Sequence, residues 1–148
     1  MIQYRSAIFA LVVLISGNAL ASEPKDLTKN DLEKLQGEWT FESFQHDGEQ
    51  KNVTEEQLEN PLKFMGKQLH HKDKKIPFTI DATSNPKLID FDLTGNPDLN
   101  TVLEGIYKLD GDRLTICLHI TKDKKERPTD FTTFEGSNRI VVQLRRIK

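Results

Sequence analysis

The fold is decided by the stretch Leu35-Gln36-Gly37-Glu38-Trp39, where a short predicted helix runs into a predicted first strand. Trp39 is the only tryptophan among the 148 residues, and it alternates in phase with Phe41. A large aromatic side chain at the entrance of a strand typically fills a hydrophobic core. We therefore expect Trp39 to sit at one end of a β-structured core.

From Gly37 onward, apolar and polar residues alternate with a period of two, which predicts strands with one buried and one wet face. On the first strand this phase places Trp39, Phe41 and Ser43 on one face, opposite Thr40, Glu42 and Phe44. About eight short strands, spaced as in an antiparallel barrel or sandwich, are predicted over 37–45, 62–65, 68–72, 76–81, 88–93, 101–109, 113–120 and 138–147. Asp110-Gly111 predicts a hairpin turn between two of them.

Two helical segments are expected outside the strands. The first covers 27–36 and would be capped by Thr28 or Asn30. The second is a helical turn within 53–60, capped by Thr54.

The N-terminus has the pattern of a secretory signal. Arg5 precedes the apolar run 7–15, and Ala19-Leu20-Ala21 resembles a cleavage site. The run is far shorter than the about 20 residues of a membrane-spanning helix. We therefore predict a signal peptide at 1–21, a polar leader and helix start at 22–31, and one barrel domain at 32–148. The mature protein would be exported, periplasmic or extracellular, with no integral membrane segment.

Charge and motif content exclude several function classes. The formal net charge of −2 does not favour nucleic-acid binding. His70 and His71 are adjacent on a predicted strand and point to opposite faces, and neither they nor His46 and His119 have metal-ligand spacing. No catalytic motif is found, so we predict no enzyme activity, no metal and no cofactor; an unrecognised hydrolase stays the third alternative.

The lone Cys117 cannot form an internal disulfide, and a buried, inert thiol is favoured over a nucleophile. Asp90 and Asp92 share the polar face of one strand and are interpreted as a solvated outer face. The basic loop 122–127 is interpreted in the same way, with docking to an acidic surface as the alternative.

A series of motifs follows one order along the chain: Leu35-Gln36-Gly37-Glu38-Trp39, Pro86-Lys87-Leu88-Ile89-Asp90, Gly105-Ile106-Tyr107-Lys108-Leu109-Asp110-Gly111-Asp112, Leu114-Thr115-Ile116-Cys117, Arg127-Pro128-Thr129-Asp130-Phe131 and Val142-Gln143-Leu144-Arg145-Arg146. Over roughly residues 32–147 the chain thereby resembles an uncharacterised, lipocalin-like family of bacterial domains first noted in planctomycetes. The resemblance implies an all-β fold: a single antiparallel eight-stranded lipocalin-like barrel with one short N-terminal helix and no established activity.

The resemblance also implies a contact at the end of the barrel. Lipocalin-type barrels pack an arginine of the last strand across the tryptophan of the Gly-x-Trp pair. Arg146 is the matching candidate over Trp39, since it is in phase with Val142 and Leu144, and Arg145 is the alternative.

The interior of such a barrel suggests two competing functions. The inward set is predicted to be Trp39, Phe41, Phe64, Phe78, Ile80, Ile89, Phe91, Leu103, Tyr107, Leu114, Ile116, Leu118, Val142 and Leu144. Eight strands either are filled by side chains or hold one small molecule. The first hypothesis is a small apolar ligand lined by Phe41, Phe78, Phe91, Gly105 and Tyr107. The alternative is a filled module that binds a protein partner or the envelope, with an outer patch around Phe44, Val141 and Leu88. A monomer is expected in both cases.

Overall fold

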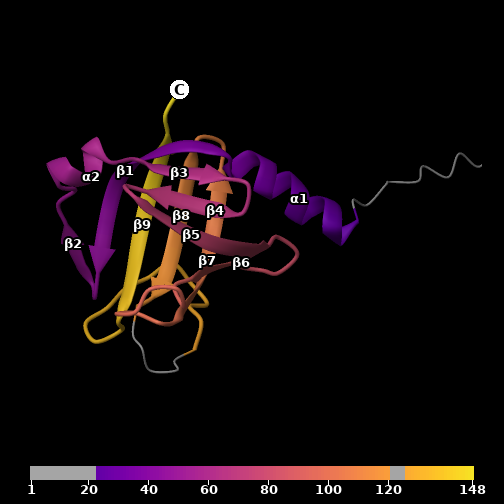
Figure 1. The fold of residues 1–148 in the computed structure, drawn as a ribbon. Helices are drawn as coiled ribbons and strands as arrows, with labels where there is room; N and C mark the ends of the chain where they lie inside the picture. The colour runs from indigo at the N-terminus through magenta and orange to yellow at the C-terminus, as the bar shows by residue number, and fades with distance from the viewer. Residues whose placement is uncertain (1–22, 121–125) are drawn as a thin grey trace, which may run out of the picture.

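The computed structural model describes residues 23–120 and 126–148, and over these residues the chain forms a closed antiparallel β-barrel with two helices (Figure 1). The elements are α1 (Pro24–Leu35), β1 (Gly37–His46), β2 (Glu49–Lys51), α2 (Glu55–Glu59), β3 (Leu62–Met65), β4 (Gln68–His71), β5 (Lys74–Asp81), β6 (Lys87–Asp92), β7 (Val102–Asp110), β8 (Arg113–His119) and β9 (Arg139–Arg146). The predicted signal peptide and most of the predicted basic loop lie outside the described residues.

The barrel closes because β1 pairs with β9 from Trp39 to His46. The strand order is β2-β1-β3-β4-β5-β6-β7-β8-β9, with the additional β1–β9 pairing. The other edge of β1 pairs with β3 at its start and with β2 at its end. The eight-stranded antiparallel barrel expected from the sequence is therefore confirmed. The ninth strand, β2, was not predicted, because its three residues are all exposed and carry no alternation.

The predicted faces of β1 are wrong for Ser43 and Phe44, because a β-bulge interrupts the pairing between Phe41 and Ser43. An extra residue in one strand reverses the alternation that follows it. Phe44 therefore lies opposite Val142 and packs against the core. Ser43 lies on the outer face, where its hydroxyl is 3.1 Å from the Oε1 atom of Gln143.

Helix α1 begins three residues earlier than predicted, because Pro24 occupies its first turn. Proline fits this position, where its fixed φ is helical and its missing N–H is not needed. Neither Thr28 nor Asn30 caps the helix; the hydroxyl of Thr28 instead accepts a hydrogen bond from the amide of Ala82. The predicted cap of α2 is confirmed, since Thr54 and Gln57 form a reciprocal capping box.

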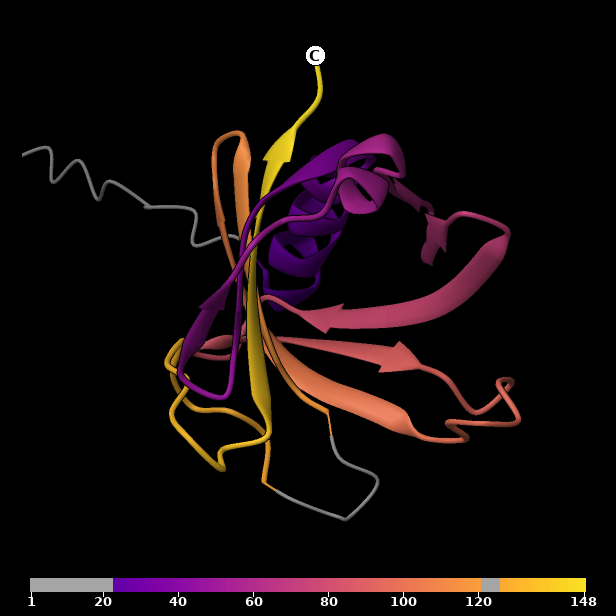
Figure 2. The same cartoon turned by 90° about the vertical axis from the view of Figure 1, so that its left-hand side faces the viewer.

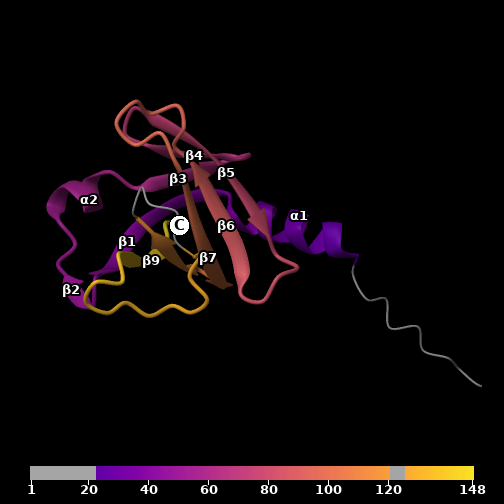
Figure 3. The same ribbon diagram turned by 90° about the horizontal axis from the view of Figure 1, so that it is seen from below.

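Helix α1 gives the barrel two different ends. The helix lies beside the end where β1 begins and β9 finishes, and buries Leu35 completely in the core (Figure 2). We call this the closed end. Segment 126–138 lies at the bottom of Figure 1, at the opposite end, which we call the open end. Because neighbouring strands are antiparallel, β1, β4, β6 and β8 all run toward this end. Seen from below, α1 projects away from the barrel wall (Figure 3).

The core matches the predicted inward set. Every member of the predicted set belongs to one hydrophobic cluster. Within this set, Phe41, Ile80 and Leu103 are partly buried and the others are buried. A second, smaller cluster lies on the outer face of the sheet, where Ile106, Cys117 and Val141 pack with Leu88 and Phe131. The predicted outer patch around Phe44, Val141 and Leu88 is therefore wrong, since Phe44 points inward and segment 126–138 contributes to the cover of the other two.

Arg127 holds this outer segment against the sheet. Its guanidinium forms two hydrogen bonds with the carboxylate of Asp90 and donates a third, 2.8 Å long, to the carbonyl of Gly105. A paired, two-point arginine–carboxylate contact is stronger and more directional than an ordinary hydrogen bond. Asp90 and Asp92 were both predicted to lie on a solvated outer face. This prediction holds for Asp92, which is exposed, and is wrong for Asp90, which is half-buried.

Gly105 permits close packing of β7 instead of opening space inside the barrel. A Cβ atom at this position would lie 2.4 Å from Cδ2 of Leu118 and 2.5 Å from the carbonyl oxygen of Cys117. Real Cβ atoms do not approach a backbone oxygen so closely, and the backbone cannot move aside without breaking the β7–β8 pairing.

Replacing Gly105 with alanine should therefore destabilise the fold by about 1–3 kcal/mol, the usual cost of overpacking. Urea unfolding followed by the fluorescence of Trp39 measures this free energy. Gly95→Ala is the matched control, because its Cβ would meet no atom within 4 Å. Equal unfolding midpoints for the two variants would contradict the packing role of Gly105.

Candidate functional site

The closed end is held by a contact between the first and last strands of the barrel. The guanidinium carbon of Arg146 lies 4.3 Å from the ring centroid of Trp39, so the contact predicted for this pair is present. Arg146 also donates hydrogen bonds to the carbonyls of Gln36 and Lys34, at the end of α1. The indole N–H of Trp39 donates to the carbonyl of Leu35, 2.9 Å away. One arginine thus joins β9, β1 and α1.

A second polar group joins α1 to the sheet beside this contact. The carboxylate of Asp31 on α1 is only 6% exposed, and it accepts hydrogen bonds from the hydroxyl of Tyr107 at 2.8 Å and the ammonium of Lys87 at 2.6 Å. Burial and the neighbouring carboxylate raise the pKa of the Tyr107 phenol far above its ordinary value. Tyr107, predicted to line a ligand site, is therefore protonated and bound to the helix.

Asp31 was not singled out from the sequence. Its signal is a single acidic residue at helical spacing from Leu35 and Thr28, on the face that the helix turns toward the barrel. A buried carboxylate is stable there because Tyr107 and Lys87 donate hydrogen bonds to it. Both partners come from strands remote in the sequence, so no local pattern predicts the contact.

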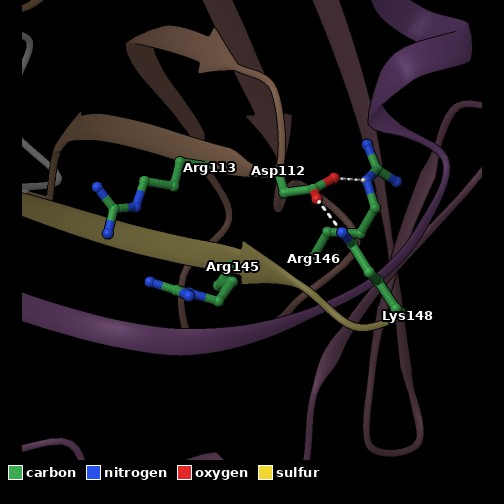
Figure 4. Close-up of a pocket in the computed structure, with 5 residues that line it drawn as sticks. All are labelled: Asp112, Arg113, Arg145, Arg146 and Lys148. Atoms are coloured by element: carbon green, nitrogen blue, oxygen red, sulfur yellow. Dashed lines mark ion pairs between the residues drawn. The ribbon is translucent and has the colours of Figure 1, made fainter.

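A surface pocket at the same end is lined by Asp112, Arg113, Arg145, Arg146 and Lys148 (Figure 4). Asp112 pairs with Arg146 and with the ammonium of Lys148, the latter 3.0 Å away. Glu42 pairs with both Arg113 and Arg145. The hydrogen bond from Arg145 keeps the pKa of Glu42 below its usual value. The pocket therefore carries excess positive charge, but each of its cations already has a carboxylate partner.

The open end has a different character. Side chains that pack against the core from this end remain partly exposed: Phe41, Phe44, Ile76, Leu103 and Ile140. Behind them Phe64, Phe78 and Phe91 are buried and form a chain of ring contacts, with centroids 5.1 Å and 6.2 Å apart. Of the predicted lining residues, Phe41 thus lies at this end, and Phe78 and Phe91 form the apolar layer beneath it.

His71 is the polar side chain among these apolar ones. It follows Leu69 by two residues on β4, so it points inward, and its ring meets the ring of Phe41 edge-on at 6.4 Å. Its Nε2 atom is buried and has no hydrogen-bond partner among the described residues. Burial lowers the pKa of His71 below its usual value, so the ring is neutral at pH 7.

Cys117 lies in the outer cluster and is fully buried. Burial raises the pKa of its thiol to about 11, so little thiolate forms at neutral pH. Among the residues described, no three histidine, cysteine, aspartate or glutamate side chains lie close enough together to hold a metal ion.

Removing the guanidinium at the closed end should destabilise the protein. We expect Arg146→Ala to lower the free energy of unfolding by about 2 kcal/mol or more, since it removes the cation–π contact and strands two helix-end carbonyls. Arg145→Ala is the matched control, because this neighbour is exposed and a surface ion pair contributes at most about 1 kcal/mol. Thermal unfolding of both variants measures the difference, and equal losses would argue against the Trp39 contact.

The buried thiol should resist modification in the native state. At pH 8 we expect iodoacetamide to label Cys117 at least tenfold more slowly in buffer than in 8 M urea, because both exposure and thiolate are lacking. Mass spectrometry of quenched samples follows the reaction. Labelling at the denatured rate in buffer would mean that segment 126–138 does not cover the thiol.

Neither helix within 23–120 and 126–148 is long and apolar enough to cross a membrane. The comparison with curated proteins found no match, nor did the comparison with solved structures. A family model matches residues 19–148, nearly the whole chain, and with it the strands of the barrel and the residues of both ends. The lipocalin-like, planctomycete-type resemblance stays a prediction. The chain belongs to the family described as a domain of unknown function, DUF5004.

Proposed function

We propose that this domain is a monomeric, non-catalytic binding module that takes a small apolar molecule into the open end of its barrel. The observation that carries the proposal is the contrast between the two ends. Leu35 and Trp39 at the closed end are fully buried, whereas Phe44 near the end of β1 and Leu103 near the start of β7 retain exposed surface at the open end. An apolar molecule that covers such surface gains about 25 cal/mol per Å² removed from water.

The absence of catalysis in this proposal rests on the state of the buried reactive groups. The thiol of Cys117 and the phenol of Tyr107 have raised pKa values and stay protonated. Asp31 is engaged by two partners. These groups act as structural contacts, and none of them faces the open end.

Export completes the proposal and rests on the N-terminal sequence alone. The signal pattern at 1–21 would place the binding module in the periplasm or outside the cell. Lipid-derived and other sparingly soluble molecules need a carrier in such aqueous compartments, and a small barrel that buries the apolar part supplies one.

The alternative of an interaction module is supported by a different observation. Leu99, Val102, Ile120 and Phe134 are exposed large apolar residues in the segments that surround the open end. A partner protein or an envelope surface could cover them. The two functions differ in where contact occurs: the ligand touches inward-facing residues, whereas a partner touches these surrounding ones.

The neutral fluorophore N-phenyl-1-naphthylamine tests the proposal. We expect saturable binding of one probe per chain, with a rise in fluorescence as the probe leaves water. Leu103→Glu should weaken binding at least tenfold, because it places a charge among the inward side chains. Val102→Glu is the matched control, since Val102 is the chain neighbour of Leu103, but its side chain points outward and is 45% exposed.

Circular dichroism confirms that both variants are folded before binding is compared. A wild-type protein that shows no saturable binding would overturn the proposed function. Equal losses in the two variants would move the contact to the surrounding surface and favour the interaction module.

A further inference from the structure

We propose that His71 recognises the polar head of the bound molecule, and that the ligand is an uncharged hydrogen-bond donor on an apolar chain, such as a long-chain alcohol. The inference rests on the proposed function and adds the chemical class of the ligand. It starts from Nε2 of His71, an inward-facing atom at the open end. Within the described part of the chain, this is the one buried side-chain nitrogen or oxygen atom without a hydrogen-bond partner.

The position of His71 follows from the place where β3 begins. β1 and β4 are not neighbours in the sheet, because β3 lies between them. The pairing of β3 with β4 reaches only as far as Lys63 and His70 at this end. His71 therefore extends past the paired region, and its ring reaches Phe41 across the interior. Phe41 in turn is one of the partly exposed inward residues of the open end.

The local sequence fixes the orientation of the imidazole. The backbone of Asn60 raises the pKa of His71, as a nearby carbonyl that accepts from a ring N–H does. Because Nε2 has no partner, our proposal assigns this N–H to Nδ1. Asn60 is held as the C-cap of α2, whose other end is secured by the Thr54 capping box. An ion pair between Glu56 and Lys72 ties α2 to the β4–β5 turn.

This arrangement leaves Nε2 with a lone pair and no hydrogen. Neutral imidazole has one donor and one acceptor nitrogen, and here the donor is already used. Burying an acceptor without a partner costs free energy, which a ligand recovers when it donates to that atom. An alcohol hydroxyl donates. An ether or a carboxylate of the same chain length cannot donate to Nε2.

Burial keeps His71 neutral, and the charged groups near it act in both directions. Burial lowers its pKa most, and the cations of Lys72 and Lys74 lower it further, whereas Glu56 and the Asn60 carbonyl oppose them. The folded-state pKa therefore lies below the usual value of 6.5. Above that value Nε2 accepts a hydrogen bond; below it the ring gains a second N–H and can only donate.

Displacement of N-phenyl-1-naphthylamine by matched ligands tests the inference at pH 7.4. We expect 1-dodecanol to bind the wild-type protein at least tenfold more tightly than dodecyl methyl ether, which has a similar chain but no donor. In His71→Phe this preference should vanish while the affinity for the ether changes by less than twofold. His70→Phe is the matched control, because His70 lies on the same strand and points outward, where its Nε2 atom is 3.3 Å from Oε1 of Gln68.

Each outcome has a distinct meaning. If the probe and both ligands fail to bind, the proposed function fails and the inference with it. If dodecanol and the ether bind equally to the wild type, or if His70→Phe loses the preference as His71→Phe does, the inference alone is overturned. Tighter binding of laurate than of dodecanol, lost in His71→Phe, would reverse the ligand class to a carboxylate.

Acidification gives a second readout that does not depend on a variant. The preference of the wild-type protein for dodecanol over the ether should decrease as the pH falls through the pKa of His71, because the protonated ring donates equally well to either oxygen. The ratio of the two dissociation constants between pH 7.4 and pH 4.5 measures this change. A ratio that stays constant over that range, with circular dichroism unchanged, would contradict recognition by Nε2.

Discussion

The structure depends on the pairing of its first strand with its last. Trp39 of β1 lies directly opposite Arg146 of β9, so the cation–π contact forms between residues that the backbone pairing already places side by side. This pairing converts an open sheet into a barrel and removes the exposed edges that an open sheet would present. The same guanidinium binds the carbonyls at the end of α1, so one side chain contributes both to the closure of the barrel and to the cover of its end.

The positions of the strands and the identity of the core followed from local alternation, because the apolar residues of each strand mark its buried side. The bulge after Phe41 could not be predicted, since it depends on how β9 aligns with β1 and not on either strand alone. The start of α1 was predicted three residues too late, because the apolar spacing that indicates the helix begins only at Leu27. Pro24, which precedes this spacing, occupies the first turn of the helix. Outer packing was also missed, because Arg127 and Asp90 meet only in the folded chain.

The candidate site was predictable in part. Aromatic inward residues such as Phe41 were identified from phase, whereas Gly105 and Tyr107 have other roles because Leu118 occupies the space beside one and Asp31 binds the other. The opposite orientations of His70 and His71 follow from a period of two. The contact of His71 with Phe41 was not predictable, because it depends on where β3 begins relative to β4, which no local pattern contains.

The concentration of fixed polar contacts at the closed end has an evolutionary consequence. Asp31, Arg146 and Trp39 maintain the architecture from one side of the molecule, far from the segments that connect β6 to β7 and precede β9. Under the proposed function, stability and selectivity would reside in separate groups of residues. Related domains could then change what they bind by exchanging side chains around the opposite rim, with little effect on folding free energy.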